Sequence, residues 1–281
     1  MNSEQLKKLA AEKAVEEIKS GMILGLGTGS TVHFALDEIS NKIKNGELKE
    51  IVCVATSIHT EEKAKRLGIP LTTLNKLYGS YEVRETSTIR RRRNEVRSTN
   101  SKSDIEHPAS SIQSAEGGQV SSLPKADKYP KLLDLTIDGA DEVDNDLNLI
   151  KGGGGALLRE KVVAQASKKV LIIVDESKLS NKLGEKFFVP VEVLQYSVNA
   201  EKFFLEALGA KVTIRKNESA ESFITDENNF ILDANFGMIN DVEELNKILN
   251  DRAGIAAHGL FVNLCDEVFC ANAEGVKVLK K

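Results

Sequence analysis

Short apolar runs alternate with helix-like segments in the first 74 residues, and this alternation constrains the fold more than any other feature. Predicted strands cover residues 22–27, 51–57 and 70–74, and predicted helices cover residues 3–20, 32–45 and 59–68. Ser3 is the expected cap of the first helix and Gly21 its stop. Strands that are apolar on both faces are typical of a parallel sheet covered by helices. The sequence therefore predicts an α/β fold with a Rossmann-like parallel sheet.

The order of predicted strands and helices changes after residue 186. Residues 187–263 follow the order strand, helix, strand, strand, helix, strand, with residues 254–262 as the last strand. This order is the signature of a ferredoxin-like α+β domain. Residues 266–280 are expected to return to the main sheet. We therefore predict a larger Rossmann-like domain over residues 1–186 and 264–281, and a smaller ferredoxin-like domain over residues 187–263.

A segment of different composition interrupts the larger domain. Residues 78–130 are rich in Ser, Thr, Arg, Lys, Glu and Gln, contain very few large apolar residues and show no sustained periodicity. Such a segment does not bury enough apolar surface to offset the entropy cost of folding. We expect a disordered or loosely ordered insertion. Its arginine run at residues 90–93 is either a nuclear localisation signal or anion-binding patch, or simply a run of solvated charges. We favour the solvated run.

Composition excludes several classes of function. The formal net charge of −4 provides no basic field, so neither nucleic acid nor an anionic membrane is the expected partner. The N-terminal segment lacks the apolar run of a signal peptide, and no segment reaches the ~18 apolar residues of a membrane span, so we expect a cytoplasmic protein. The 3 cysteines and 4 histidines match no metal-binding spacing. Buried free thiols and no metal site are therefore expected.

The turn after the first predicted strand contains three glycines, Gly25, Gly27 and Gly29. It resembles a dinucleotide fingerprint only in part, because Ser30 replaces the third fingerprint glycine and no acidic residue ends the next strand. A Walker lysine is also absent. Backbone N–H groups at the start of a helix, with the hydroxyls of Thr28, Ser30 and Thr31, suit one phosphate monoester. The alternative is a tight turn that needs glycine for its dihedral angles.

An acidic loop follows the strand predicted near residues 133–137. Asp138, Asp141 and Glu142 lie where open α/β sheets place their ligands, and Asp144 and Asp146 come slightly later. Each of these acids has an alternative role as a solvated loop residue or helix cap, and we expect the last two to be solvated. The spacing does not fit a calcium loop, which disfavours a metal.

Lys151 stands directly before four glycines at residues 152–155. A glycine run lets backbone approach a ligand and offers N–H donors to a developing oxyanion, which the lysine would also stabilise. The alternative is a surface lysine ahead of a flexible loop. Glu160, on the next predicted helix, is either solvated or turned inward as a partly buried general base with a raised pKa.

Five segments, taken together, resemble the A-type ribose-5-phosphate isomerases: GLGTGSTVHF, TIDGADEVD, KGGGGALLREK, IVDESK and FVPVEV, in the order of that family. The resemblance covers nearly the whole chain except residues 78–130. It implies an aldose–ketose isomerase of the pentose phosphate pathway that interconverts ribose 5-phosphate and ribulose 5-phosphate. It also implies no metal or organic cofactor, a sugar phosphate as the partner molecule, and a homodimer or homotetramer.

Residue by residue, the resemblance implies that Glu160 moves a proton between C1 and C2 of the sugar through an enediolate. Asp138 and Lys151 then serve ring opening and proton handling at the sugar oxygens, with Asp141 beside them. The residues implied in binding phosphate or sugar hydroxyls are Lys7, Thr28, Gly29, Ser30, Thr31, Gly152, Gly153 and Lys178.

The insertion departs from the family, which normally connects the two flanking strands by a short loop. We expect it to be a surface excursion. Two other functions compete with the isomerase: a sugar-phosphate-sensing regulator, disfavoured because no DNA-binding helix-turn-helix segment precedes the domain, and an NAD-dependent oxidoreductase, disfavoured by the failed fingerprint.

Overall fold

The computed structural model describes residues 1–79 and 130–281. The chain divides into two compact units, residues 1–73 with 131–281, and residues 74–130. In the second unit, residues 74–79 are helical and the Tyr78 hydroxyl donates a hydrogen bond of 2.8 Å to the Pro130 carbonyl. The rest of the predicted insertion, including the arginine run at residues 90–93, lies outside the described residues. The expectations made for it remain predictions.

A six-stranded sheet in the order β13-β12-β6-β3-β1-β2 organises the first unit. Neighbouring strands from β12 to β2 pair in parallel, and β13 is an antiparallel edge strand. The predicted α/β class and the return of the C-terminal segment to the main sheet are confirmed. The strands are β1 (Ile23–Leu26), β2 (Val52–Ala55), β3 (Leu135–Asp138), β6 (Val170–Asp175), β12 (Glu267–Asn272) and β13 (Gly275–Lys280).

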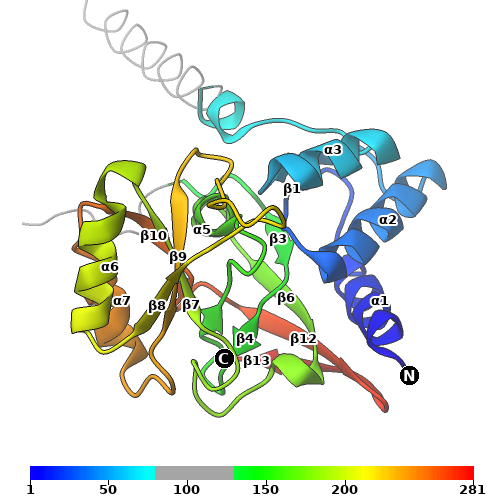
Figure 1. Cartoon of the computed structure of the whole chain (residues 1–281). Helices are drawn as coiled ribbons and strands as arrows, with labels where there is room; N and C mark the ends of the chain where they lie inside the picture. Colours follow the sequence, from blue (N-terminus) through cyan, green and yellow to red (C-terminus); the bar gives the residue numbers. More distant parts are fainter. Residues whose placement is uncertain (80–129) are drawn as a thin grey trace, which may run out of the picture. The chain divides into compact units, whose positions relative to one another are not determined.

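Helices cover both faces of this sheet (Figure 1). Leu171 and Ile173 of β6 belong to a core with α1 (Ser3–Val15) and α2 (Ser30–Lys44). The intervening Ile172 belongs to a second core with Ala164 of α5 (Leu157–Gln165). Because alternate residues of a strand point to opposite faces, a strand between two helical layers must be apolar throughout. All six residues of β6 are buried accordingly.

Two local predictions at the N-terminal end need correction. The first helix begins after Asn2, whose side chain forms a capping box with Gln5, so Ser3 is not its cap. Helix α1 also ends at Val15 rather than near residue 20. Helix α3 (Ile58–Leu67), by contrast, ends as predicted at Gly68, which is left-handed with φ of 76°.

Residues 70–74 do not form the predicted strand. Leu71 forms a single parallel bridge with Cys53, flanked by hydrogen bonds from Cys53 N to the Pro70 carbonyl and from Thr72 N to the Cys53 carbonyl. Pro70 has no N–H to extend the ladder, and the chain turns into helix from residue 74. Apolar composition alone was therefore a misleading signal here.

A four-stranded antiparallel sheet in the order β10-β7-β9-β8 forms the smaller part of the fold. Its chain order is the predicted strand, helix, strand, strand, helix, strand. Leu205 and Leu249 pack the two helices onto one face, and Figure 1 shows these helices grouped apart from α1–α3. The elements are β7 (Val189–Val193), α6 (Val198–Ala207), β8 (Lys211–Ile214), β9 (Phe230–Asn235), α7 (Val242–Asn250) and β10 (Ile255–His258).

The predicted strand at residues 254–262 is divided between two sheets. After β10, Gly259 carries the chain into β11 (Leu260–Phe261), which pairs with β5 (Leu149–Ile150) beside β4 (Glu142–Val143). A Cβ atom at Gly259 would lie 2.4 Å from the Lys151 carbonyl oxygen, so glycine permits this crossover to pack tightly. Periodicity does not reveal such a change of partner.

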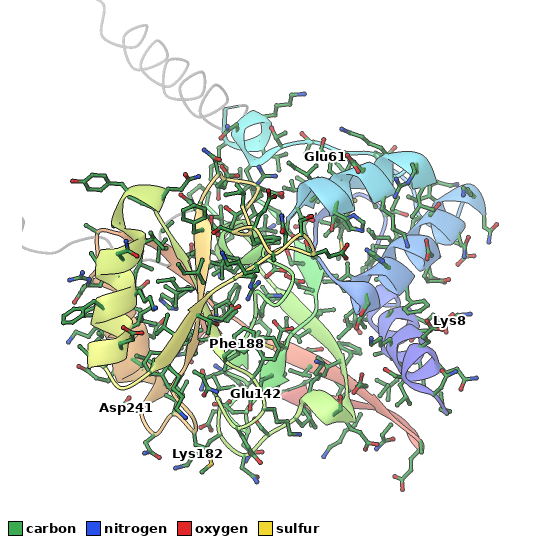
Figure 2. All side chains as sticks on the ribbon, viewed as in Figure 1. Lys8, Glu61, Glu142, Lys182, Phe188 and Asp241 are labelled. Atoms are coloured by element: carbon green, nitrogen blue, oxygen red, sulfur yellow. The ribbon has the colours of Figure 1, made fainter. Side chains whose placement is uncertain are left out.

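Charged side chains lie both on the surface of the fold and in its interior, as the labelled residues in Figure 2 illustrate. Lys8 and Glu61 lie on outward faces, whereas Glu142 is fully buried and accepts hydrogen bonds from the backbone N–H groups of residues 184, 186 and 187. Glu142 thus supports the loop before β7. The three cysteines are free and buried, as predicted. Among the described residues, no helix is both long and apolar enough to cross a membrane.

Candidate active site

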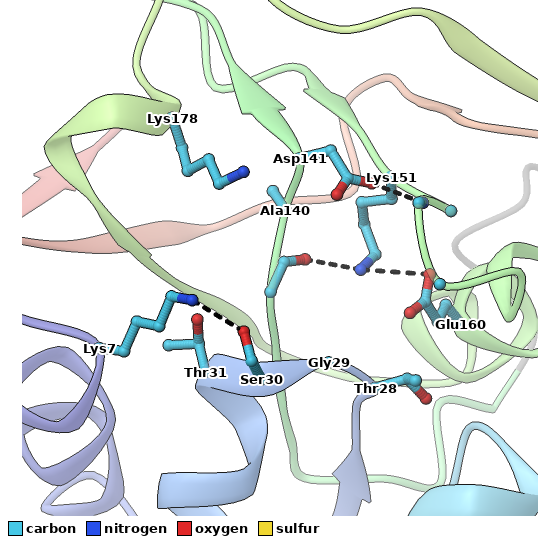
Figure 3. Close-up of a pocket in the computed structure, with 14 residues that line it drawn as sticks. Lys7, Thr28, Gly29, Ser30, Thr31, Ala140, Asp141, Lys151, Glu160 and Lys178 are labelled. Carbon is cyan, nitrogen blue, oxygen red and sulfur yellow. Dashed lines mark hydrogen bonds and ion pairs between the residues drawn. The ribbon is translucent and has the colours of Figure 1, made fainter. Parts of the chain in front are cut away.

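A pocket opens at the carboxyl ends of β1 and β3, between the start of α2, the glycine loop and the start of α5 (Figure 3). Every predicted site residue except Asp138 lines it, and Asp138 lies directly behind it in contact with Lys151. The fold therefore brings together residues from segments more than 100 positions apart. The lining residues are Lys7, Thr28, Gly29, Ser30, Thr31, Gly139, Ala140, Asp141, Lys151, Gly152, Gly153, Gly154, Glu160 and Lys178.

One end of the pocket is basic. Lys7 of α1 donates a hydrogen bond of 3.0 Å to Oγ of Ser30, and Lys178 approaches from the 3₁₀ turn Glu176–Lys178 after β6 (Figure 3). Gly29 precedes α2 with φ of 119°, a conformation that favours glycine, and leaves the first N–H groups of the helix facing the pocket. Two lysines and a helix N-terminus make this end suitable for an anion.

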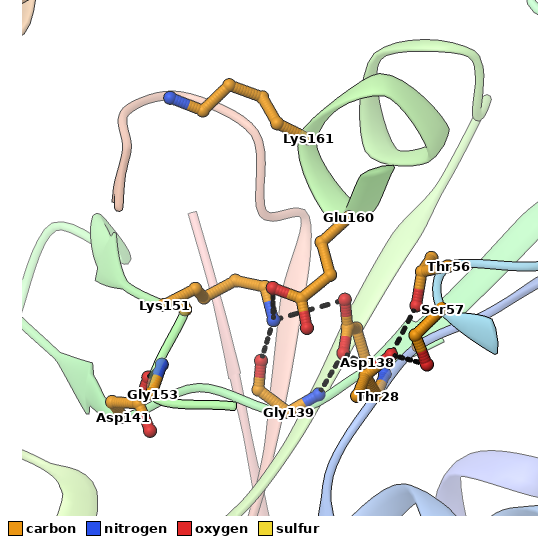
Figure 4. A network of polar contacts seen from close by, with 12 residues as sticks. Thr28, Thr56, Ser57, Asp138, Gly139, Asp141, Lys151, Gly153, Glu160 and Lys161 are labelled. Carbon is orange, nitrogen blue, oxygen red and sulfur yellow. Dashed lines mark hydrogen bonds and ion pairs between the residues drawn. The ribbon is translucent and has the colours of Figure 1, made fainter. Parts of the chain in front are cut away.

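The other end holds a buried cluster of charges (Figure 4). The Lys151 ammonium lies 3.1 Å from Oδ2 of Asp138 and 3.3 Å from Oε2 of Glu160, and donates a hydrogen bond of 2.6 Å to the Gly139 carbonyl. All three side chains are at most 5% exposed. The lysine thus stands between two carboxylates that water does not solvate.

Burial raises the pKa of Glu160 to about 8, because the nearby charge of Lys151 only partly offsets the loss of hydration and the charge of Asp138 adds to the rise. Burial also raises the pKa of Asp138, against the opposing influence of Lys151. For Lys151 burial acts to lower the pKa, but the carboxylates of Asp138, Glu160 and Asp141 outweigh it and the pKa is raised. The lysine stays charged while Glu160 can exchange a proton near neutral pH.

Local backbone contacts hold Asp138 in place. Its Oδ1 accepts hydrogen bonds from the N–H groups of Thr28, at 3.1 Å, and Gly139, at 2.7 Å. A Cβ atom at Gly27 would lie 2.6 Å from the Asp138 Cα atom, so the turn directly after β1 must carry glycine where it passes the aspartate. The sequence suggested that this turn needs glycine for its dihedral angles. The structure adds a steric reason, because a side chain at Gly27 would collide with Asp138 at the end of β3.

The glycine loop is tied to its surroundings at Gly153. Its N–H donates a hydrogen bond of 2.7 Å to Oδ2 of Asp141, and Arg215 donates to the carbonyls of Gly152 and Gly153 at 2.8 and 3.0 Å. Arg215 also pairs with Asp233. The sequence carried no local signal for Arg215, because it follows β8 in the smaller part of the fold. The loop is therefore held rather than flexible.

Thr28 directs its hydroxyl away from the basic end of the pocket. Its Oγ1 lies 2.8 Å from the hydroxyl oxygens of both Thr56 and Ser57, and 3.2 Å from that of Thr60 (Figure 4). Sequence reasoning did not assign the last three residues, although Thr56 and Ser57 occupy the place where a dinucleotide fold carries its acid. They form a buried hydroxyl cluster that fixes the turn after β1.

The remaining acids of the loop have structural roles or none. Asp144 was expected to be solvated, but it is only 8% exposed and accepts hydrogen bonds from the backbone N–H groups of Asp146 and Asn148 and from the side-chain Nδ2 of Asn148. It stabilises the turn between β4 and β5. Asp146 is exposed, as predicted. Within the described residues, no group of three or more His, Cys, Asp or Glu side chains is placed to hold a metal ion.

A buried glutamate with a raised pKa beside a charged lysine suits proton transfer at carbon, and an anion site in the same pocket suits a phosphorylated molecule. Fold and site together define an α/β enzyme that acts on small phosphorylated substrates. The family model of ribose 5-phosphate isomerase A (phosphoriboisomerase A) matches residues 109–275. The chain belongs to the ribose 5-phosphate isomerase A family.

Individual relatives extend the match over the whole chain. Ribose-5-phosphate isomerase A of Desulfatibacillum aliphaticivorans is 45% identical over 279 residues, covering 99% of this chain and 98% of the relative. A solved D-ribose-5-phosphate isomerase in complex with phospho-erythronic acid is 32% identical with a TM-score of 0.79 and covers 100% of both chains. The Plasmodium falciparum ribose 5-phosphate isomerase structure is 38% identical with a TM-score of 0.76, covering 99% of each chain.

Proposed function

We propose that this protein interconverts ribose 5-phosphate and ribulose 5-phosphate through an enediolate. The observation that carries the proposal is the buried cluster of Asp138, Lys151 and Glu160 beside a pocket with a basic end. Relatives named as this isomerase agree with it. The relative solved with phospho-erythronic acid, a phosphorylated sugar acid, supports the same kind of ligand here.

In the proposed mechanism the phosphate binds at the basic end, against Lys7, Lys178 and the start of α2. This anchoring supplies binding energy away from the reacting carbons and orients them. Gly29, Ser30 and Thr31 contribute N–H and hydroxyl donors, while Thr28 shapes the turn. Gly152 and Gly153 leave room for the sugar.

Glu160 is the proposed base that takes the proton from C2 of the aldose and returns it to C1. Its raised pKa suits this step, because a weakly acidic C–H needs a base stronger than an ordinary carboxylate. The Lys151 ammonium stabilises the negative charge that develops on the sugar oxygen. Asp138 holds the lysine from behind the pocket, and the two serve ring opening and proton transfer between the sugar oxygens, with Asp141 beside them in the pocket wall.

We further propose that the protein is a cytoplasmic homodimer or homotetramer that needs no metal or organic cofactor and does not bind nucleic acid. We also propose that the chain forms a larger domain of residues 1–186 with 264–281 and a smaller domain of residues 187–263. The net charge of −4 supports the absence of a nucleic-acid partner.

The test of the function is an assay of the purified protein with ribose 5-phosphate in the presence of EDTA. We expect ribulose 5-phosphate to form, and the reverse reaction to proceed from ribulose 5-phosphate to the same equilibrium ratio. A folded sample without turnover would contradict the function. A strict requirement for added metal would instead contradict the cofactor-free mechanism.

The pH dependence of kcat/KM is expected to follow the Glu160 carboxyl of the free enzyme. The base must be ionised, so activity should rise tenfold per pH unit at acidic pH and level off above about 8, where burial has placed the Glu160 pKa. The substrate phosphate, with a second pKa of about 6, adds a lower inflection of its own. Initial rates from pH 5 to 10 check this, and a plateau that begins near pH 5 would contradict it.

A further inference from the structure

Lys161 follows Glu160 on α5 but points to a different part of the molecule (Figure 4). Its amine donates hydrogen bonds of 2.7 Å to the His258 carbonyl and 3.0 Å to the Leu260 carbonyl. It also lies 5.0 Å from the centre of the Phe261 ring. Among the described residues no carboxylate pairs with it. Removing an amine from water without a counter-ion costs free energy, which its hydrogen bonds to the two carbonyls help to offset.

The two carbonyls that Lys161 binds flank Gly259, where the chain crosses from β10 to β11. Gly259 in turn accepts a hydrogen bond of 2.9 Å from Lys151 N, and its own N–H donates one of 2.7 Å to the Pro190 carbonyl. The crossover packs directly on Lys151, because any side chain at Gly259 would meet the Lys151 carbonyl. The backbone of Lys151 therefore rests on the segment that Lys161 holds.

The environment of the amine keeps its donors in place whether or not it is charged. Nε2 of His258 lies 3.1 Å from Oδ1 of Asn250, an acceptor, so Nε2 carries the ring proton and Nδ1 faces Lys161 at 3.5 Å. Burial, with the charge of Lys161 added, lowers the pKa of His258 to about 3, and burial lowers the pKa of Lys161 to about 7. A neutral amine still has two N–H donors, enough for both carbonyls.

We propose that Lys161 is a positioning residue that sets the separation of the Glu160 carboxylate and the Lys151 ammonium. It ties α5, which carries Glu160, to the crossover on which Lys151 rests, and those two groups stand 3.3 Å apart. Both lysines also approach the buried Phe261 ring, Lys151 at 5.5 Å from its centre. Without the tie, apolar packing such as that of Leu157 on α5 against Ala257 of β10 is left to hold the helix beside the crossover. This inference rests on the proposed isomerase function.

The test replaces Lys161 by methionine, which keeps the length of the side chain and removes its donors. We expect kcat to fall by about 10-fold to 100-fold, as for a small misplacement of catalytic groups, with KM changed little. The acidic limb of kcat/KM should also move upward by about one pH unit, because a more distant Lys151 no longer lowers the Glu160 pKa as strongly. Loss of stability alone does not produce this shift.

Two further variants complete the test. Lys161→Arg keeps donors for both carbonyls and should restore the limb toward its original pH. Arg159→Met removes a cation from the same helix that pairs with Asp226 and Glu227 instead, and should leave both kcat and the limb unchanged. If Lys161→Met lowers only the melting temperature and leaves kcat and the limb as they were, the proposal is wrong. Should the methionine variant not fold, Lys161→Leu, which also lacks donors, is judged on the same two measurements.

A second readout does not depend on turnover. Acetic anhydride treatment at pH 8 followed by peptide mass spectrometry measures how fast Lys151 is acylated relative to Lys8. Buried and charged, Lys151 should react slowly in the original protein and faster in Lys161→Met. An unchanged acylation rate of Lys151 would overturn the positioning role, whether or not the protein is an isomerase. A missing isomerase activity, in contrast, would contradict only the proposed function.

Discussion

Glu160→Gln is expected to lower kcat by roughly 10²-fold to 10⁴-fold, the contribution typical of a general base. KM should change little, because the amide has nearly the shape of the carboxyl and the phosphate contacts lie at the other end of the pocket. Steady-state kinetics with ribose 5-phosphate measure both constants. A near-original kcat would remove Glu160 from the role of base. Glu61→Gln, an exposed position on α3, is the matched control.

Stability measurements separate this loss from misfolding. The pKa of Glu160 is raised from 4.5 to about 8 in the folded protein. Between these two pH values the Glu160 carboxyl is protonated in the folded state and ionised in the unfolded state. The free energy of unfolding therefore falls as pH rises, and the full loss is reached above about pH 8. Glu160→Gln should therefore have a larger free energy of unfolding than the original protein at pH 8.5. Urea unfolding should show this difference shrinking toward pH 4.5.

Lys151→Met is expected to lower kcat by about 10²-fold to 10³-fold, the loss seen when a donor to a developing oxyanion is removed. Its effect on pH dependence should be equally clear. Without the ammonium, Asp138 and Glu160 become two neighbouring buried carboxylates, and the pKa of Glu160 rises further. The acidic limb of kcat/KM should move above pH 8, as measured by initial rates across pH.

The same substitution should destabilise the protein most strongly at alkaline pH, where both carboxylates are ionised. Removing one partner of a buried ion pair typically costs about 3–5 kcal/mol. Lys168→Met is the control, because Lys168 pairs with Asp134 at 2.7 Å while its side chain is 60% exposed. Such a surface pair contributes at most about 1 kcal/mol. Unchanged kcat in a folded Lys151→Met protein would contradict the role given to the lysine.

Much of the fold was predictable because its signals are local. Strand β6 lies between two helical layers, and this position requires the unbroken apolar run that the sequence displays. The change to a strand–helix–strand–strand–helix–strand order likewise appears in the sequence, since each element carries its own periodicity and turn residues. The site residues could be predicted for a related reason. Parallel strands present their carboxyl ends at one edge of the sheet, so the glycine turn and the acidic loop that begins at Asp138 were expected at the same edge.

The errors lie where a distant segment decides the outcome. Residues 70–74 have strand-like composition but make a single bridge, because Pro70 cannot extend the ladder. Residues 254–262 read as one strand, yet Gly259 allows the chain to change sheets against Lys151. Asp144 looked solvated, although its turn folds back to bury it. Arg215 offered no signal at all.

By itself the sequence determined the alternation of strands and helices, the positions of the acids and glycines at strand ends, and the resemblance to a family. Only the tertiary structure decided that Asp138, Lys151 and Glu160 form one cluster and that Glu160 has a pKa of about 8. The physical reason is that a pKa depends on desolvation and on charges a few ångströms away. Those charges belong to residues that are separated along the chain and that meet only after the sheet, the crossover at Gly259 and α5 have packed together.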